Sequence, residues 1–127
     1  MTSAQQFADA LHQLEDDRDL DGFLSQFAED AHLVRPEGRG DEHGHDGARR
    51  FWQAYLDQFE QISSTFSRVE QSGAFGELEW TGDGTLRTGR AVSYRGVSLL
   101  ELDDAGLVRR FATYYDTAAF LVPPAGA

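Results

Sequence analysis

The chain contains no cysteine and no lysine among its 127 residues. The lack of cysteine excludes disulfide bonds, thiolate nucleophiles and cysteine-ligated zinc. The lack of lysine excludes Schiff-base catalysis, because that chemistry needs a lysine amine. All 11 basic residues are therefore arginines, whose side chains stay charged at any physiological pH.

Long apolar runs and an excess of positive charge are also missing. No apolar stretch approaches the roughly 18 residues that a membrane-spanning helix needs. The N-terminal stretch MTSAQQFADALHQLEDD lacks both a basic start and an apolar segment, so we expect no signal peptide and a cytoplasmic protein. The formal net charge of −11 argues against nucleic acid or an anionic membrane as a partner.

The composition that remains is that of a folded protein. Hydrophobic residues make up 40% of the chain and aromatic residues 12%, which is enough apolar surface to build a core. A chain of this length fits one core and not two, so we expect a single domain over residues 1–127.

The N-terminal part shows helical periodicity. Phe7, Leu11 and Leu14 recur at helical spacing and predict a helix over residues 3–16, with Ser3 as its N-cap. Asp19 is predicted to cap a second helix, because apolar residues again fall on one helical face after it. These residues are Leu20, Phe23, Leu24 and Phe27.

A short strand and a third helix are expected next. Residues 31–35 are predicted to form a short strand, and Pro36 ends its regular pairing. After a glycine-containing loop, Asp46 is the predicted N-cap of a helix with an aromatic face. That face consists of Phe51, Trp52, Tyr55, Leu56 and Phe59.

From residue 62 onward the pattern changes to strands separated by glycine-containing turns. The stretches ISSTFSRVEQSG, AFGELEWTGDG, RAVSYRGVSLLELDDAG and LVRRFATYYDTAAFLV alternate or run apolar, which predicts an antiparallel meander. Asp103 to Gly106 is a strong hairpin signal. Three helices followed by a run of strands indicate an α+β fold, with the helices on one face of a curved sheet.

Three stretches resemble a known family: FLSQFAEDAHLV, HGHDGARRFW and VSLLELDDAGLVRRFATYYD. Their order and spacing are similar to those of the SnoaL-like branch of the nuclear-transport-factor-2-like superfamily, over about residues 5–121. That superfamily includes ketosteroid isomerases, limonene epoxide hydrolases and polyketide cyclases. The resemblance implies a cone, in which a curved, mixed sheet wraps around the helical segment and leaves an apolar pocket at the open end. It also implies a homodimer through the outer face of the sheet.

The catalytic residues of ketosteroid isomerases have no counterpart in this sequence. The resemblance places Arg35 where those enzymes have the aspartate base, Leu11 where they have the oxyanion tyrosine, and Ser98 where they have the neutral aspartic acid. An arginine cannot abstract a proton at neutral pH. We therefore do not expect isomerisation by that mechanism.

A comparison with limonene epoxide hydrolases places altered residues at the catalytic positions. Their arginine-x-aspartate pair falls near Glu77-Leu78-Glu79, and their second aspartate falls at Thr113. Glutamate thus replaces aspartate, and an arginine would have to come from another strand. No acid or base residue can be placed by comparison with the polyketide cyclases.

Arg35 is the first candidate for a catalytic residue, because the resemblance implies that this position points into the pocket. A guanidinium there could hold a carboxylate, an enolate or a phenolate through paired hydrogen bonds. The alternative is a structural ion pair with Glu79 or Glu37. Glu79 is the second candidate, as an acid or base of raised pKa if it faces inward. A shift of one residue would instead turn Glu77 and Glu79 to solvent and Trp80 to the pocket, and the sequence leaves both registers open.

His43 is the third candidate, as a proton shuttle at the mouth of the pocket. Together with His45 it could contact a metal ion, but the spacing matches no known metal signature and we expect no metal. The alternative is a solvated polar loop. By strand alternation, His32 should point away from the pocket.

A further set of residues is expected to line the pocket and bind ligand. The set consists of Leu11, Trp52, Tyr55, Tyr94, Ser98, Phe111, Thr113 and Tyr115. Aromatic walls with a few hydroxyl groups and one arginine suit a small, mostly apolar ligand that carries one anionic or carbonyl group.

Three functions fit these patterns. The first is a cofactor-independent isomerase, cyclase, lyase or hydrolase of a small apolar carbonyl compound, of polyketide or terpenoid type, with Arg35 stabilising an anion. The second is a non-catalytic domain that binds a small ligand in the same pocket. The third is a dimeric scaffold with a vestigial pocket. An ionisable group of perturbed pKa near Arg35 inside the pocket would favour the enzyme.

Overall fold

A computed structural model describes residues 2–36 and 40–121 of the chain. Its helices are α1 (Ala4–Asp17), α2 (Leu20–Leu24) and α3 (Gly44–Gln58). Its strands are β1 (Phe27–Val34), β2 (Glu42–His43), β3 (Phe59–Ser72), β4 (Phe75–Leu86), β5 (Ala91–Leu102) and β6 (Val108–Tyr115). A 3-10 helix, η1 (Thr117–Phe120), follows the last strand.

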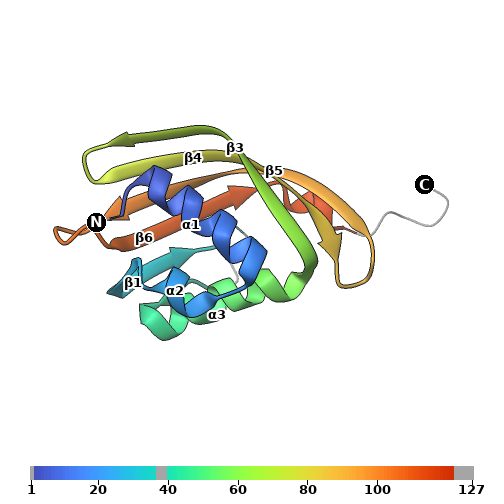
Figure 1. Cartoon of the computed structure of the whole chain (residues 1–127), viewed down its shortest axis with the longest axis horizontal. Helices are drawn as coiled ribbons and strands as arrows, with labels where there is room; N and C mark the ends of the chain where they lie inside the picture. The colour runs from blue at the N-terminus through green and yellow to red at the C-terminus, as the bar shows by residue number, and fades with distance from the viewer. Residues whose placement is uncertain (1, 37–39, 122–127) are drawn as a thin grey trace.

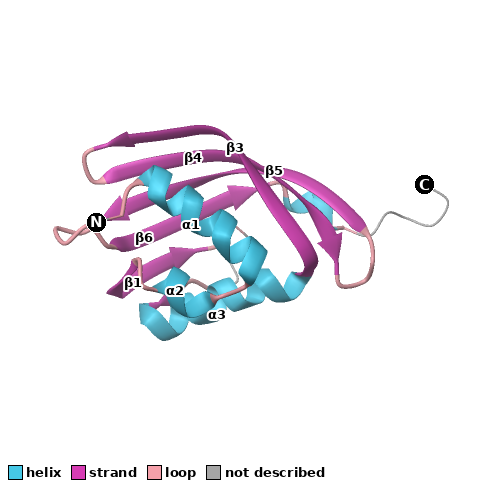
Figure 2. Ribbon diagram, viewed as in Figure 1, coloured by secondary structure: helices cyan, strands magenta, loops and turns pink. Residues whose placement is uncertain are grey.

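The strands form one mixed sheet in the order β2-β1-β6-β5-β4-β3. β1 runs parallel to β6, and the other neighbouring strands are antiparallel. The sheet is curved and the helices lie on one side of it, with α1 against β3 and α3 against β1 (Figures 1 and 2). The predicted α+β class is therefore confirmed, and the parallel pairing makes the sheet mixed rather than a simple meander.

Local signals fix where the first two helices start. The side chain of Ser3 accepts from the backbone N–H of Gln6, and that of Asp19 accepts from the backbone N–H of Gly22, so both predicted caps are confirmed. Between the two helices, Arg18 takes a left-handed conformation with φ 58. Its guanidinium donates to the backbone carbonyls of Leu56, Phe59 and Glu60, which ties the end of α1 to the end of α3.

Three of the predicted helix boundaries are wrong. Phe59 does not lie on α3, which ends at Gln58; it is the first residue of β3. Phe27 does not lie on α2, which ends at Leu24; it is buried as the first residue of β1. An aromatic residue can be buried on a strand as well as on a helix, so its position in the apolar pattern did not distinguish the two. Asp46 does not cap α3, which begins at Gly44 with His43 in the cap position. His43 is held in β2, and Gly44 turns the chain with a positive φ of 74, so the helix starts earlier. Asp46 lies in the first helical turn, where a carboxylate is still favourable.

The core sits between the helices and the inner face of the sheet at the end where β1 meets β6. The Phe7 ring lies 5.4 Å from that of Phe111, and the Phe23 ring lies 4.8 Å from that of Trp52. Phe7 and Phe27 are fully buried. Together these rings close one end of the space that the curved sheet surrounds.

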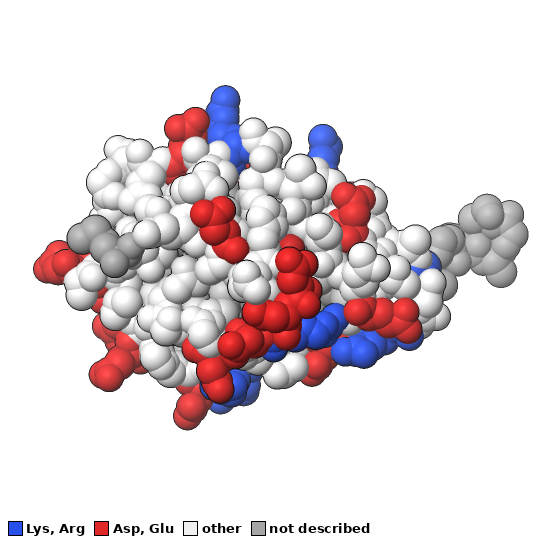
Figure 3. All heavy atoms as spheres, in the orientation of Figure 1, with Lys and Arg blue, Asp and Glu red and all other residues white. Residues whose placement is uncertain are grey.

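The surface in view carries both signs of charge. Acidic side chains are spread over the side on which α1 and α3 lie, with basic side chains beside them rather than in a separate patch (Figure 3). This distribution agrees with the formal net charge of −11. Among the described residues, no helix is long and apolar enough to cross a membrane.

Candidate functional site

A cavity of about 270 Å³ opens between α1, α3 and the inner face of the sheet. Its walls are mostly aromatic and aliphatic, with a few polar groups among them, which is typical of a small-molecule site. The lining residues are Leu11, Arg35, Pro36, Phe51, Trp52, Ala54, Tyr55, Gln58, Ser64, Trp80, Tyr94, Ser98, Phe111, Thr113 and Tyr115.

Two aromatic residues of β4 and β5, Trp80 and Tyr94, lie across glycines of the neighbouring strand. Trp80 is paired with Gly96, and Tyr94 is paired with Gly82. A Cβ atom on Gly96 would lie 2.5 Å from the Trp80 ring, and one on Gly82 would lie 3.0 Å from the Tyr94 ring. The glycines thus leave room for both rings, which meet edge to face at 5.3 Å and form part of the cavity wall.

A chain of polar side chains crosses the sheet side of the cavity. The indole N–H of Trp80 donates to Ser98 Oγ at 3.0 Å, and Ser98 Oγ lies 3.0 Å from Thr113 Oγ1. Ser98 and Thr113 are paired on β5 and β6 and are both buried. The sheet register therefore brings these polar groups into one hydrogen-bonded row.

A second polar group, built around Glu15, joins α1, α3 and β3. The Glu15 carboxylate accepts from the Tyr55 hydroxyl at 2.7 Å, from the Ser64 backbone N–H at 2.9 Å and from the Ser64 hydroxyl at 2.6 Å. Tyr55 and Ser64 line the cavity, and Glu15 stands behind them. Glu15 follows Leu11 by one helical turn, so both side chains lie on the cavity side of α1.

Two tyrosines of the cavity wall have perturbed pKa values. Burial, followed by the charge of Glu15, raises the pKa of Tyr55 well above its usual value. Burial also raises the pKa of Tyr94, with smaller contributions from Tyr115 and Glu15. Both phenols therefore remain protonated at neutral pH and act as hydrogen-bonding groups rather than as bases.

Arg35 lies on the cavity wall at the end of β1. Its guanidinium is 5.0 Å from the centre of the Phe51 ring, in a cation–π arrangement. It also donates to the Glu42 carboxylate at 3.4 Å, and Glu42 accepts a closer bond of 3.0 Å from Arg50. The side chain of Arg35 is 25% exposed, so it contacts both the cavity and solvent. Its acidic partner is thus Glu42 rather than Glu79; Glu37 lies outside the described residues.

All the residues predicted to bind ligand lie on the wall of this cavity, and so does Arg35. Trp52 has one additional property. Its buried indole N–H has no acceptor within the described part of the chain. An unpaired buried donor is costly, so a ligand oxygen that reached it would gain a hydrogen bond.

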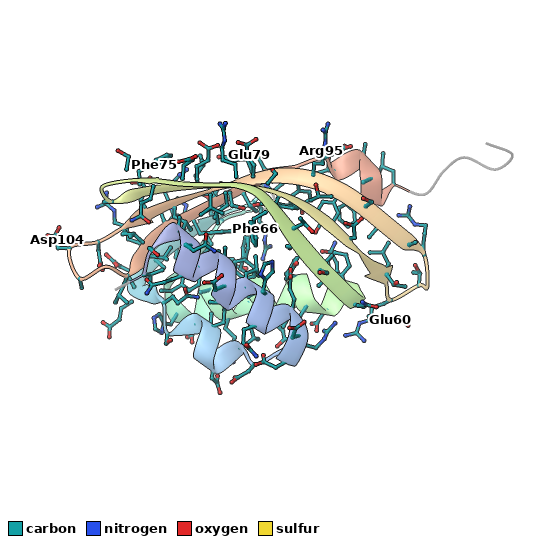
Figure 4. All side chains as sticks on the ribbon, turned by 45° about the horizontal axis from the view of Figure 1, so that its top comes forward. Glu60, Phe66, Phe75, Glu79, Arg95 and Asp104 are labelled. Carbon is teal, nitrogen blue, oxygen red and sulfur yellow. The ribbon has the colours of Figure 1, made fainter. Side chains whose placement is uncertain are left out.

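Glu79 does not face the cavity. The β4 register turns Leu78 inward, where it is 1% exposed, and turns Glu79 to the outer face, where its side chain is 44% exposed. There Glu79 lies 3.6 Å from Arg68, and Figure 4 shows Glu79 and Arg95 on the side of the sheet away from the helices. The expectation that Glu79 faces the pocket is therefore wrong. Side chains alternate along β4, and this register places Trp80 at the pocket instead.

His43 also lies outside the cavity lining. It stacks on His32 at 4.6 Å, and His32 contacts Asp41 at 2.7 Å on the side of β1 away from the cavity. Nε2 of His45 lies 2.7 Å from the backbone oxygen of Phe27. Pairing of β2 with β1 holds His43 at the edge of the sheet, so its expected placement as a proton shuttle at the pocket is wrong. No group of three or more His, Cys, Asp or Glu side chains in the described ranges is placed to hold a metal ion.

Sequence reasoning missed Glu15, which lies near the end of the helix predicted over residues 3–16. The available signal was its spacing of four residues from Leu11. Ser64 was missed as well, since nothing in a serine-rich strand marks one hydroxyl as the partner of a distant carboxylate.

Comparison with protein families agrees with this geometry. The model of the SnoaL-like domain matches residues 4–111, which is most of the chain. The chain therefore belongs to the SnoaL-like family. No curated protein has a matching sequence.

Solved structures support the same fold. An NTF2-like protein of unknown function from Burkholderia pseudomallei is 23% identical, with a TM-score of 0.81, and the match covers 94% of this chain and 95% of that one. TerC, co-crystallised with polyporic acid, is also 23% identical, with a TM-score of 0.79 and the same coverage of 94% and 95%. The epoxide hydrolase/cyclase-like enzyme SalBIII is 13% identical, with a TM-score of 0.75 and coverage of 94% and 97%. At these identities the likeness shows the fold alone.

Proposed function

We propose that this protein binds a small, mostly apolar molecule in the cavity and that Arg35 holds a carbonyl or anionic oxygen of that molecule. The observation that carries the proposal is a guanidinium on the wall of an otherwise largely apolar cavity. A charged donor next to aromatic rings binds an oxygen more strongly than it would in water, because the surroundings have a low dielectric constant. TerC, which shares the fold, was crystallised with a small molecule.

The contacts of Arg35 leave it able to bind such an oxygen. A guanidinium has five N–H donors. Its bond to Glu42 is long at 3.4 Å, and Glu42 bonds more closely to Arg50 at 3.0 Å. The Phe51 ring packs against the Arg35 guanidinium at 5.0 Å and orients it. Arg35 is thus positioned by its described neighbours without using all its donors on them.

Binding is better supported than catalysis by the groups that line the cavity. Among the described residues, no lining side chain is a carboxylate or an imidazole. Tyr55 and Tyr94 have raised pKa values, so both phenols stay protonated and do not act as bases at neutral pH. A pocket without a base favours the binding function over an isomerase, cyclase, lyase or hydrolase.

Catalysis remains the second candidate because of one observation. The Glu15 carboxylate lies 2.7 Å from the hydroxyl of Tyr55, which lines the cavity. A proton from a ligand could pass to the Tyr55 oxygen while the Tyr55 proton passes to Glu15. Arg35 would then stabilise the anion formed, and no cofactor would be required.

The proposed binding can be tested with a pair of naphthalene probes of similar shape, the anionic 2-naphthoate and the neutral 2-naphthalenemethanol. We expect 2-naphthoate to raise the melting temperature of the protein more than the alcohol does, because a ligand that binds only the folded state stabilises it. In Arg35→Met, which keeps much of the apolar stem, calorimetry should show naphthoate binding weakened by about tenfold or more.

The matched control is Arg109→Met, which removes an exposed guanidinium that does not line the cavity. It carries the same change of charge and should leave naphthoate affinity unchanged. Equal losses in both variants would mean that only the overall charge matters. No binding of naphthoate to the unmodified protein would overturn the proposal.

We also propose that the chain forms a homodimer through the outer face of the sheet. Two large side chains on that face, Phe75 and Tyr114, are 44% and 42% exposed. Analytical ultracentrifugation of Tyr114→Asp and of the unmodified protein tests this: the variant should shift to monomer, and an unmodified protein that is already monomeric would contradict the dimer. The cytoplasmic location and the single domain remain predictions.

A further inference from the structure

The two polar groups of the cavity wall differ in the hydrogen atoms that they leave for a ligand. In the Glu15 group, the Tyr55 hydroxyl and the Ser64 hydroxyl both donate to the same carboxylate, at 2.7 and 2.6 Å. Both hydroxyl hydrogens are therefore used inside the group. Only oxygen lone pairs of Tyr55 and Ser64 remain for the cavity, so this side presents acceptors.

The polar row on the sheet has the opposite property, because it contains one more donor hydrogen than its internal hydrogen bonds use. Trp80, Ser98 and Thr113 contribute an indole N–H and two hydroxyl groups, but only two hydrogen bonds join them. Trp80 can only donate, so one hydroxyl hydrogen is left over whichever way the bond between Ser98 and Thr113 runs. Within the described residues, Ser98 and Thr113 are joined to other side chains by these two bonds, and both residues line the cavity, so the remaining hydrogen can face a ligand there. The sheet side therefore presents a donor.

The two groups lie on different sides of the cavity. Ser98 and Thr113 belong to β5 and β6, whereas Tyr55 and Ser64 belong to α3 and to β3, the strand at the edge of the sheet. A ligand in the cavity thus faces a donor on the sheet and acceptors beneath α1. Arg35 adds a charged donor at the end of β1, and the indole N–H of Trp52, which has no acceptor among the described residues, adds another on α3.

We infer that the cavity selects ligands that carry a hydroxyl group as well as a carbonyl or carboxylate, and that this hydroxyl donates to the oxygen of Tyr55. The ligand class is that of small apolar hydroxy acids and hydroxy ketones, phenols included. Glu15 is a positioning residue in this account: it does not touch the ligand, but it fixes the direction of the Tyr55 hydroxyl. The inference rests on the proposed binding function.

The Tyr55 hydroxyl stays on Glu15 because that bond is the stronger one. Hydrogen bonds to a carboxylate are roughly twice as strong as those between neutral groups. If the Tyr55 hydroxyl turned to an ether or carbonyl oxygen of a ligand, the half-buried Glu15 carboxylate would lose one of its donors. A ligand with an acceptor next to Tyr55 is therefore disfavoured.

The inference is tested by calorimetry with three probes that share a carboxylate for Arg35: 6-hydroxy-2-naphthoate, 6-methoxy-2-naphthoate and 2-naphthoate. On the full, unmodified chain, the hydroxy compound should bind about tenfold or more tightly than either of the others. The unsubstituted probe separates polarity from size, since it is smaller than the hydroxy compound and fits wherever that compound fits.

The decisive variant is Glu15→Gln. Its amide NH₂ can donate to the oxygens of Tyr55 and Ser64, which releases their hydroxyl hydrogens toward the cavity. The preference should then invert, with the methoxy compound bound as tightly as the hydroxy compound or more tightly. The control is Asp16→Asn, which makes the same charge change at an exposed neighbour and should keep the preference of the unmodified protein.

Tyr55→Phe provides a second variant if Glu15→Gln does not fold. It removes the acceptor, so the hydroxy and unsubstituted probes should bind equally well. A preference for the hydroxy compound that survives in Glu15→Gln or in Tyr55→Phe would overturn the inference, as would its absence in the unmodified protein. If none of the three carboxylates bound the unmodified protein, the proposed function itself would fail and the inference with it.

Discussion

The two faces of strands β4 and β5 place neighbouring residues in opposite environments. On the inner face, the half-buried Trp80 donates to the buried Ser98 at 3.0 Å and its ring packs against the buried Tyr94. On the outer face of the single chain, Glu79 and Arg95 alternate with these residues and point away from the helices, as Figure 4 shows. Bonds shielded from water are directional and costly to break, whereas exposed ion pairs are weak and screened by salt. Stability and ligand selection should therefore depend on the inner face.

The sharpest test of this difference uses two adjacent residues. Leu78→Ala empties a site that is 1% exposed in the core and should lower the free energy of unfolding by about 2–5 kcal/mol. Glu79→Ala removes only an exposed partner of Arg68 at 3.6 Å, so it should change the free energy of unfolding by less than about 1 kcal/mol. Urea unfolding of both variants measures the two values. Similar losses in both would show that the strand register is wrong.

The next largest effect is expected at Gly96. The Cβ atom of Gly96→Ala would lie 2.5 Å from the Trp80 ring and 2.7 Å from the backbone oxygen of Tyr114, so the ring has to move. Overpacking of this kind costs about 1–3 kcal/mol, and loss of the bond to Ser98 should also shift tryptophan fluorescence.

Gly22→Ala is the matched control for Gly96→Ala. Its new Cβ atom would meet nothing closer than an ordinary contact at 3.5 Å, so the protein should be at least as stable as before, because alanine is the better helix former. An unchanged melting temperature in Gly96→Ala would contradict the placement of Trp80 on the inner face.

The tyrosines of the inner face predict a loss of stability at high pH. The folded-state pKa values of Tyr55 and Tyr94 are raised above the ordinary value of 10.0, so the folded protein holds these protons more tightly than the unfolded chain does. Their contribution to stability is complete below pH 10 and is lost as the pH rises above it, because the unfolded chain ionises first. Chemical unfolding from pH 8 to 12 should show this decline, and it should be smaller in Tyr94→Phe. An equally steep decline in that variant would rule out Tyr94 as a cause.

The smallest effect is expected for the outer ion pairs of Glu101. This carboxylate lies 3.3 Å from Arg109 and 3.6 Å from Arg110, and its side chain is 35% exposed. Glu101→Gln should cost less than about 1 kcal/mol, and 1 M NaCl should reduce the difference because salt screens exposed charges. A larger loss that persists in salt would mean that these ion pairs are not solvated, as would be the case if a second copy of the chain covered the outer face.

Much of the fold could be predicted because local signals and the tertiary structure agree. Ser3 and Asp19 cap their helices as expected, since a cap bond joins residues only three positions apart. The Asp103 to Gly106 hairpin also forms, with Gly106 at a positive φ of 80. The predicted start of α3 was wrong because that start depends on the pairing of β2 with β1. This pairing joins two separate segments, so no local pattern indicates it.

The site was predictable only where a family position settles which way a side chain points. Arg35 and Ser98 reach the cavity as expected, but Glu79 does not, because alternation in β4 has two registers and the sequence favours neither. The bond of Glu15 to Ser64 joins residues 49 positions apart, and no local pattern encodes such a contact. Polar networks of this kind become visible only when the chain is folded.

The most direct test of the account is a crystal structure of the protein bound to 6-hydroxy-2-naphthoate. We predict the carboxylate beside the Arg35 guanidinium and the hydroxyl within hydrogen-bonding distance of the Tyr55 oxygen, with the rings between Trp80 and Phe111. A ligand bound on the outer face of the sheet, or a ligand in the cavity whose carboxylate does not contact Arg35, would contradict the claim that the Arg35 guanidinium makes this cavity a binding site.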